Sequence, residues 1–245
     1  MSLVVIESPS LGEGWLDASR AILERGALAR YDEQLTRELA LLTLMIRRPS
    51  SGDPVIAERG DPEWLAWMHD NFFVHKDVPE LGAAKSYAAR LFNYAGAGRD
   101  QIAWVIDRLR ADPASRSATI TTFQPLTDTA YIPCVSMLDF WRPKGAIELV
   151  VYAHSLDFGK KAYGNLIELA RLQEHVAAEL GVAVGQLVVH AKSAHVYEPE
   201  WALMADIAAS DEFSVARGMS STEKPLNALV FSSKRNTLLC LGVLG

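Results

Sequence analysis

A long amphipathic pattern between two strand patterns limits the architecture of the second half of this chain. Its apolar residues recur at helical spacing: Leu166, Leu169, Leu172, Val176 and Leu180. Gly181 follows at the place where the C-terminal cap of a helix is expected. Segments 146–152 and 186–190, which flank this helix, have the composition of strands. The pattern predicts a domain that mixes helices and strands.

Three further segments extend the predicted sheet. Residues 118–123 and 136–141 have strand patterns, and the Pro-Lys-Gly sequence at 143–145 predicts a hairpin turn from the second of them to the next strand. The tail, residues 228–245, predicts one more hairpin, with its turn at residues 234–236.

The first half of the chain is predicted to be mainly helical. Apolar residues recur at helical spacing in segments 15–23 and 101–110, so each predicts a helix. Segment 35–46 is an apolar run that suits a buried strand or a helix, and both remain open. Segment 50–63 has the composition of a loop, and Asp61 at its end is placed to cap a helix that begins at Pro62.

Composition excludes some classes of protein. With 245 residues, of which 49% are hydrophobic and 22% charged, the chain has the composition of one globular domain spanning residues 1–245. A net charge of -6 without a basic run argues against a nucleic-acid partner. No apolar stretch reaches the roughly 18 to 20 residues that cross a bilayer, so we expect no membrane association and a cytoplasmic protein.

The two cysteines, Cys134 and Cys240, are too few for a disulfide framework and lack metal-ligand spacing. No metal site is therefore predicted. Each cysteine is either a small buried hydrophobic residue or a single reactive thiol.

Cys134 lies within an ordered set of fragments rich in polar residues. The fragments are Asp100-Gln101-Ile102, the run LRADPASR that ends at Arg116, Pro133-Cys134, the run YAHSLDFGKKAYGN from Tyr152 to Asn165, and His195-Val196-Tyr197. In this order and at these separations they resemble the thymidylate synthase superfamily, including its pyrimidine hydroxymethylases. The resemblance implies an α+β fold, a mixed sheet with helices on one face, whose other face is buried in a homodimer.

The resemblance also implies a chemistry. Cys134 would be the nucleophile whose thiolate adds to C6 of a pyrimidine and makes C5 reactive. Tyr87 resembles the tyrosine that helps to remove the C5 proton, although Ala88 stands where the family usually has glycine. Arg116 resembles the arginine that reaches from the partner subunit towards the substrate phosphate near the thiol. The implied carbon donor is 5,10-methylenetetrahydrofolate.

The binding residues implied by the resemblance divide into two groups. Asn165 would read the pyrimidine edge and favours a uracil-type base, because the cytosine hydroxymethylases typically have aspartate there. Ser155 would lie near the phosphate, and His195 and Tyr197 would bind the sugar hydroxyl. Asp157 would bind the folate pterin. The ring faces of Trp64 and Trp67 could stack on a folate, although a buried helix face is the preferred explanation of both.

Several positions depart from the family pattern. Arg116-Ser117 replaces two consecutive arginines, and Ala153-His154-Ser155 replaces Gln-Arg-Ser, so two phosphate ligands are missing. His154 could replace one of them when protonated. Lys160 and Lys161, near the family's folate-contacting glycine, could redirect a phosphate or obstruct the cofactor. The usual proton-transfer glutamate has no clear counterpart; Glu58 and Glu63 lie roughly where it should be.

The sequence therefore predicts a pyrimidine C5 one-carbon transferase, with hydroxymethyl transfer to a uracil-type nucleotide or nucleoside preferred. The SYxxRLxNY and SRSATI segments look closer to the hydroxymethylases than to thymidylate synthase. A methylating synthase is the first alternative. The others are a diverged homologue that only binds a pyrimidine-like ligand, and thiolate chemistry without folate.

Overall fold

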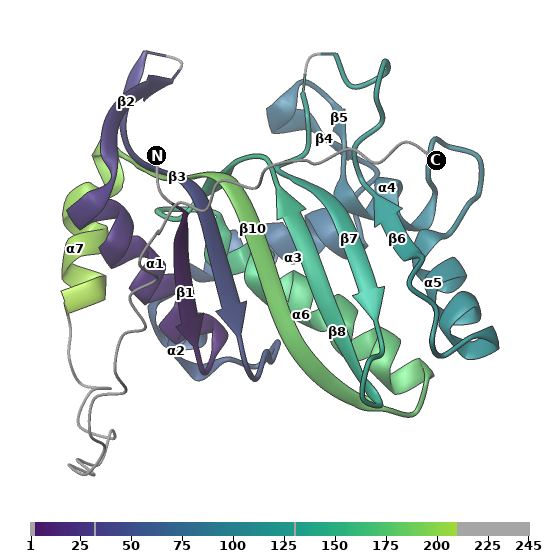
Figure 1. Ribbon diagram of the computed structural model, residues 1–245. Coiled ribbons are helices and arrows are strands. Elements are labelled where there is room, and N and C mark those ends of the chain that lie inside the picture. Colours follow the sequence, from purple (N-terminus) through teal and green to yellow (C-terminus); the bar gives the residue numbers. More distant parts are fainter. Residues whose placement is uncertain (1–2, 32, 130, 210–245) are drawn as a thin grey trace, which may run out of the picture. The chain divides into compact units, whose positions relative to one another are not determined.

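A mixed β-sheet forms the centre of the computed structural model, which describes residues 3–31, 33–129 and 131–209 (Figure 1). Eight strands of the described residues form this sheet: β1 (Val4–Ser8), β2 (Ala27–Tyr31), β3 (Gln34–Ile46), β6 (Ala118–Thr121), β7 (Val135–Trp141), β8 (Ala146–Ala153), β9 (Leu156–Asp157) and β10 (Ala183–Tyr197). The main path runs β1-β3-β10-β8-β7-β6, and β2 and β9 pair with β3 and β10. β4 (Asp77–Val78) and β5 (Ala84–Lys85) form a separate pair.

The strand directions are mixed. β10 is parallel to β8 and β9 but antiparallel to β3, whereas β6, β7 and β8 are successively antiparallel. The predicted hairpin joins β7 to β8, and Gly145 in its turn has a φ of 81°, a conformation that glycine adopts without strain.

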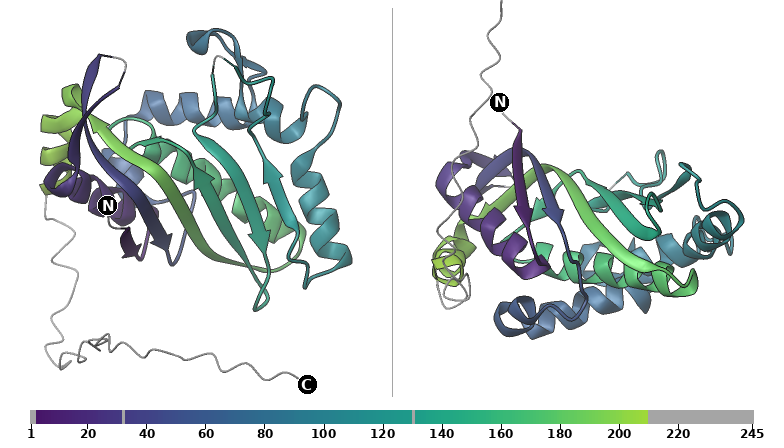
Figure 2. Two further views of the ribbon diagram at one scale, coloured as in Figure 1. Left: turned by 45° about the horizontal axis from the view of Figure 1, so that its top comes forward. Right: turned by 60° about the horizontal axis from the view of Figure 1, so that its bottom comes forward.

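Helices cover one face of the sheet. They are α1 (Leu11–Arg25), α2 (Pro54–Arg59), α3 (Pro62–Phe73), α4 (Tyr87–Phe92), α5 (Gln101–Ala111), α6 (Ala162–Glu179) and α7 (Trp201–Ala209), with short 3-10 turns at Pro79–Leu81 and Glu198–Glu200. In Figures 1 and 2, α3 and α6 lie against the same face.

The predicted α+β fold, a mixed sheet with helices on one face, is confirmed. None of the described helices is long and apolar enough to cross a membrane.

The predicted helices form because their caps and apolar faces agree. Leu166, Leu169, Leu172 and Val176 of α6 are buried against the sheet, and Gly181 follows with a φ of 64°. The Asp61 carboxylate accepts from the backbone N–H groups of residues 63 and 64, which begins α3 as predicted.

Segment 50–63 is not a continuous loop, contrary to the prediction. It contains α2, because Asp53 caps the backbone N–H groups of Val55 and Ile56, and Pro54 occupies the first turn. The side chains of Val55 and Ile56 are buried in the core, which stabilises so short a helix. The same cap signal that predicted α3 was thus present twice, at positions eight residues apart.

The open choice for segment 35–46 is decided by its position in the sheet. It is strand β3, which pairs with β1, β2 and β10. Strand β10 is also longer than the predicted segment 186–190, since it continues to Tyr197 beside β9. The predicted hairpin at 228–245 lies outside the described residues. That one domain spans residues 1–245 stays a prediction.

Candidate active site

The candidate site lies at the end of the sheet where β7 begins and β8, β9 and β10 end. Cys134 directly precedes β7 and is half-buried. Its carbonyl accepts from the backbone N–H of His154 at 3.0 Å, which joins it to the end of β8. The parallel pairing of β8 and β9 with β10 brings residues from distant parts of the sequence to this one end.

Two tyrosines surround the Cys134 thiol. The Tyr131 hydroxyl donates a hydrogen bond to the sulfur, and Tyr87 is close enough for its charge state to be coupled to that of the thiol. Burial raises the pKa of the Cys134 thiol; the charge of Lys161 and the hydrogen bond from Tyr131 oppose this rise, while Asp157 adds to it. Cys134 is therefore mainly in the thiol form at neutral pH.

Tyr87 is held rigidly at the start of α4. Its ring is buried and stacks on Phe72, with ring centroids 4.3 Å apart. Its hydroxyl oxygen accepts from the backbone N–H of Val135 at 2.9 Å, next to Cys134. Burial raises the pKa of Tyr87 well above its usual range, so it stays protonated and suits proton donation rather than acting as a phenolate base.

Asp157 and Lys161 form a turn at the start of α6. The Asp157 carboxylate accepts from the backbone N–H groups of Gly159 and Lys160 at 3.0 and 3.3 Å, and its carbonyl accepts from the backbone N–H of Lys161 at 3.1 Å. Burial raises the pKa of Asp157 to about 6 although Lys161 and these N–H groups lower it, and Glu200 raises it further.

This raised pKa predicts a pH-dependent stability. Between the ordinary value of 3.8 and about 6, folded Asp157 binds more protons than unfolded Asp157, so its stabilising contribution is present below about pH 4 and is lost as the pH rises through 6. The Asp157→Asn variant should therefore gain stability relative to wild type between pH 4 and pH 7. Urea denaturation at both pH values measures the difference, and an equal difference at both would contradict it.

Asn165 lies in the first turn of α6 and is buried, 3% exposed. Its Nδ2 donates to the Lys161 carbonyl at 2.9 Å, and since a carbonyl can only accept, this contact fixes the orientation of the amide. Within the described residues, Asn165 Oδ1 has no hydrogen-bond partner. A buried acceptor without a partner is costly, so it suits a ligand that brings an N–H group.

His195 and Tyr197 lie on β10 beside β9. His195 pairs in register with Asp157, its carbonyl accepts from the backbone N–H of Phe158 at 2.8 Å, and its ring meets that of Tyr197 edge-on, with centroids 5.0 Å apart. The His195 Nδ1 lies 3.3 Å from the Ser193 hydroxyl. Burial lowers the pKa of His195, so its imidazole is neutral at pH 7.

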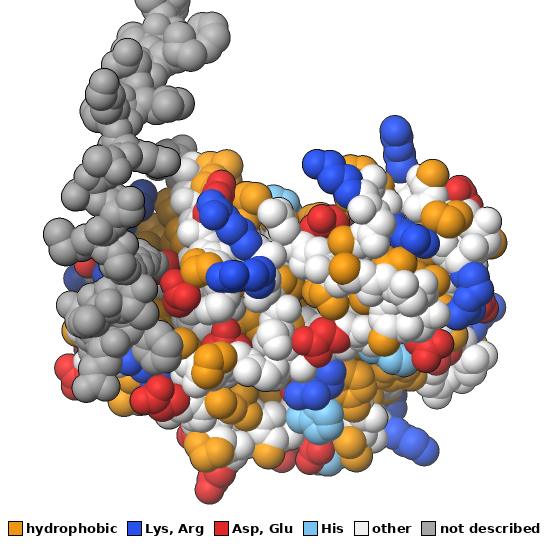
Figure 3. Space-filling model, turned by 90° about the horizontal axis from the view of Figure 1, so that it is seen from below, with side chains coloured by type: hydrophobic (Ala, Val, Ile, Leu, Met, Phe, Trp, Pro, Cys, Tyr) orange, Lys and Arg blue, Asp and Glu red, His pale blue; other side chains and the backbone are white. Residues whose placement is uncertain are grey.

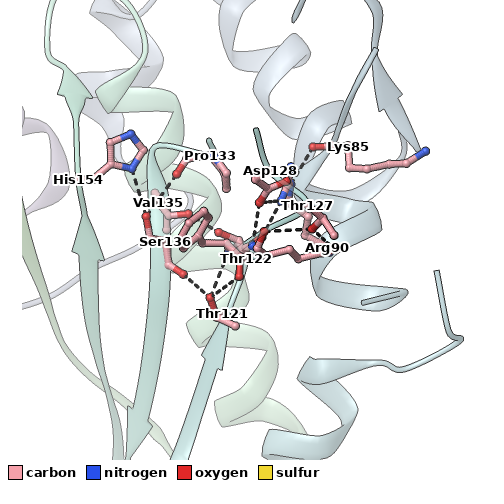
Figure 4. A network of polar contacts seen from close by, with 12 residues as sticks. Lys85, Arg90, Thr121, Thr122, Thr127, Asp128, Pro133, Val135, Ser136 and His154 are labelled. Atoms are coloured by element: carbon pink, nitrogen blue, oxygen red, sulfur yellow. Dashed lines mark hydrogen bonds and ion pairs between the residues drawn. The ribbon is translucent and has the colours of Figure 1, made fainter. Parts of the chain in front are cut away.

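His154 and Ser155 occupy the turn between β8 and β9. Figure 4 shows the His154 ring pointing towards Ser136, with Nδ1 3.2 Å from the hydroxyl. Burial and the charge of Lys192 lower the pKa of His154, so the ring is neutral at pH 7. His154 was predicted to replace a phosphate-binding arginine, which requires a protonated ring. Its surroundings oppose that protonation. Ser155 is half-buried beside it.

A buried ion pair holds the loop that leads to Cys134. Arg90, on α4, binds Asp128 through both terminal nitrogens at 2.7 and 2.9 Å and donates to the carbonyls of Thr122 and Lys85 (Figure 4). The side chains are 2% and 10% exposed. The Thr122 hydroxyl donates to the Val135 carbonyl, which connects this ion pair to the start of β7.

The predicted cofactor-binding residues lie on α3 and at the turn between Asp157 and Lys161. Trp64 and Trp67 are half-buried and meet edge-on with centroids 5.3 Å apart, and Lys160 Nζ lies 4.9 Å from the Trp64 ring centre.

Glu200 Oε2 is buried without a hydrogen-bond partner among the described residues, and Glu200 interacts with Asp157. These acceptor oxygens fit the N–H edge of a pterin, whereas Lys160 covers one side of Trp64. Glu58 and Glu63 are exposed.

Arg116 is the one predicted site residue that the described part of a single chain places elsewhere. It lines a surface hollow with Asp139, Trp141 and Val150, near the far end of β7. Because β7 spans Val135–Trp141, Arg116 lies about 20 Å along the strand from Cys134 at ~3.3 Å per residue. Figure 3, which views that end, shows basic and acidic side chains interspersed. Its predicted role at the substrate phosphate of a partner subunit stays a prediction.

Sequence reasoning missed several residues of the site. Tyr131 precedes Cys134 by only three positions, so its proximity was visible, but its hydrogen bond depends on the loop conformation. Arg90 lay within a recognised fragment, although nothing in the pattern paired it with Asp128. Lys161 was expected to redirect a phosphate or obstruct the cofactor, not to lower the pKa of Cys134. Glu200 carried no local signal, because its contact with Asp157 joins the ends of β9 and β10.

Comparison with known proteins identifies sequences similar to this chain. A family model described as thymidylate synthase matches residues 41–224. A relative in Methanosarcina acetivorans is 37% identical over 213 residues, which cover 83% of this chain and 94% of the relative. A relative in Methanothermobacter thermautotrophicus is 32% identical over 206 residues, 79% of this chain and 93% of the relative. Both carry the name "Putative thymidylate synthase". The chain belongs to the thymidylate synthase family.

Proposed function

We propose that the chain is a hydroxymethylase that transfers a one-carbon unit to C5 of a uracil-type nucleotide or nucleoside. Membership of the family supports, at the coarser level, a transferase acting on pyrimidine C5. The observation that carries the proposal is a half-buried cysteine thiol, hydrogen-bonded to Tyr131, at the same end of the sheet as Asn165 Oδ1, which no described residue pairs with.

The residues of the site support each part of the reaction. The Cys134 sulfur would add to C6, so that electron density moves to C5, and it would leave again when the product forms. Protonated Tyr87 would donate a hydrogen bond to a water molecule that takes up the C5 proton. Asn165 Oδ1 would accept from the ring N3–H of uracil, which neutral cytosine lacks.

The carbon donor proposed is 5,10-methylenetetrahydrofolate, which when bound supplies carbon at the oxidation level of formaldehyde. Asp157 and Glu200 would accept from its pterin, and Trp64 and Trp67 would lie beside it. The preference for hydroxymethyl over methyl product rests on the SYxxRLxNY and SRSATI segments. Release of a hydroxymethyl product requires that water reaches the activated carbon.

We also propose a homodimer in which Arg116 completes the neighbouring site. Four apolar side chains are exposed beside buried neighbours in their strands, which places them on the face of the sheet opposite the helices: Val5, Met137, Trp141 and Tyr152. Apolar side chains exposed together on one face of a sheet favour association. The separation of Arg116 from its own Cys134 supports the same arrangement. A monomeric mass in sedimentation equilibrium would overturn this part of the proposal.

Tritium release from C5 tests the proposed reaction. The protein would be incubated with C5-tritiated dUMP, UMP, dCMP, CMP and the free nucleosides, with and without methylenetetrahydrofolate. We expect folate-dependent release from a uracil substrate, and a hydroxymethyl product by mass spectrometry. A methyl product would instead support a thymidylate synthase, release without folate would support thiolate chemistry alone, and no release from any substrate would support a binding protein.

A further inference from the structure

We propose that Asn71 is a positioning residue of the reaction, which holds Tyr87 so that its hydroxyl lies against the backbone next to Cys134. The inference rests on the proposed function, in which Tyr87 takes part in removal of the C5 proton. It goes further because it assigns a role to a residue that no sequence pattern singled out. It also makes α3, the helix that carries Trp64 and Trp67, the element that fixes Tyr87.

The Asn71 side chain binds a backbone donor at the start of α4. Asn71 is 5% exposed, and its Oδ1 accepts from the Tyr87 backbone N–H at 3.2 Å. Since a backbone N–H can only donate, this contact identifies the oxygen as the atom of the amide that faces α4. The N-cap residue Ser86 accepts from the N–H of Ala89, which leaves the Tyr87 N–H for Asn71. The first N–H groups of a helix have no partner within it, so this acceptor ties Tyr87 to α3.

The chain at the end of α3 holds the same part of α4 at further points. The Phe72 ring, 1% exposed, stacks on the ring of Tyr87. The carbonyl of His75 accepts from the Ser86 hydroxyl, and the carbonyl of Lys76 accepts from the Ser86 backbone N–H at 3.2 Å. Both the backbone and the ring of Tyr87 are therefore fixed by residues 71–76.

The opposite end of the Tyr87 side chain lies beside the thiol. Its hydroxyl oxygen accepts from the backbone N–H of Val135 at 2.9 Å, and Val135 directly follows Cys134. A hydroxyl has one hydrogen and two lone pairs, so accepting from Val135 leaves the hydrogen for a different acceptor. Because the phenol ring is rigid, a displacement of the Tyr87 backbone moves this hydroxyl away from Val135. The acceptor on Asn71 thus sets the direction in which Tyr87 donates.

Helix α3 is also packed closely on α6 beside Asn165. A Cβ atom at Gly164, the residue before Asn165, would lie 3.1 Å from the Cβ of Met68. Only glycine allows the two helices to approach this closely. One helix therefore contacts the elements that carry Tyr87 and Asn165, which keeps the proton donor in place relative to the residue proposed to bind the pyrimidine.

Steady-state tritium release with the best uracil substrate tests the assignment. Asn71→Leu keeps the volume but removes the acceptor, and we expect kcat to fall about tenfold with KM within about twofold of wild type, because other residues bind the substrate. Asn71→Asp keeps an acceptor for the Tyr87 N–H and should restore kcat to within about threefold of wild type. Asp70→Asn, the matched control on the same turn of α3, should have the wild-type kcat.

Fluorine NMR of protein labelled with 3-fluorotyrosine reports the position of Tyr87 without pyrimidine or folate. The Tyr87 signal is assigned by its loss in Tyr87→Phe. We expect Asn71→Leu to shift or split this signal and to leave the other tyrosine signals in place. The Asn71→Asp and Asp70→Asn proteins should have the Tyr87 signal at its wild-type position.

A Tyr87 signal unchanged in Asn71→Leu, or the same loss of kcat in Asn71→Asp as in Asn71→Leu, would overturn the proposal. Circular dichroism confirms that each variant is folded, and Asn71→Ala provides the same comparison if the leucine variant is not. A wild-type protein without tritium release would contradict the proposed function. The fluorine signals would then still show whether Asn71 positions Tyr87, so the two failures are distinguishable.

Discussion

Replacement of Cys134 by serine should reduce C5 tritium release at least about 1,000-fold, because a serine hydroxyl is a far weaker nucleophile than a thiolate. The substitution removes little volume, and Cys134 is half-buried, so the fold should persist. The hydrogen bond that Tyr131 donates can be accepted by the serine oxygen. The loss of activity would therefore report chemistry rather than unfolding.

Cys240→Ser is the matched control for this experiment, since it removes the other cysteine of the chain. It should retain the wild-type rate. Initial rates with the best uracil substrate, at saturating folate, give the comparison. Retention of more than a tenth of the wild-type rate by Cys134→Ser would exclude a covalent role for this thiol and favour a reaction that needs no nucleophile from the protein.

Replacement of Arg90 by methionine should lower the free energy of unfolding by about 3–5 kcal/mol, the usual cost of removing one partner of a buried ion pair. The change leaves the Asp128 carboxylate buried without its counter-ion. It also removes the donors to the carbonyls of Thr122 and Lys85. The methionine side chain occupies similar space, so a cavity contributes little.

Urea denaturation followed by circular dichroism measures this effect. Arg99→Met is the matched control, because Arg99 is exposed and such surface substitutions usually change stability by less than about 0.5 kcal/mol. An Arg90→Met protein as stable as Arg99→Met would show that the ion pair contributes nothing net. Asp128 lies on the loop that ends at Cys134. We therefore expect the Cys134 thiol of the variant to react with iodoacetamide at more than one rate.

The elements that were predicted correctly are those with local causes. Helix α6 could be read because its apolar face and Gly181 agree within one segment, and α3 because Asp61 and Pro62 form its cap. The helix α2 was missed although Asp53 and Pro54 give the same signal, because the surrounding composition is that of a loop. Strand β3 could not be assigned, since an apolar run carries no period that separates a buried strand from a helix.

The ordered residues from Asp100 to Tyr197 were enough to identify the family and to name most candidate site residues, because such residue types at fixed separations rarely occur together by chance. Which residues contact these site residues depends on the tertiary structure. The charge of Lys161 lowers the pKa of Cys134 because the start of α6 lies at the same end of the sheet as the loop before β7, and Arg90 of α4 binds Asp128 of that loop. Charge interactions depend on distance and burial, and neither can be read from separation along the chain.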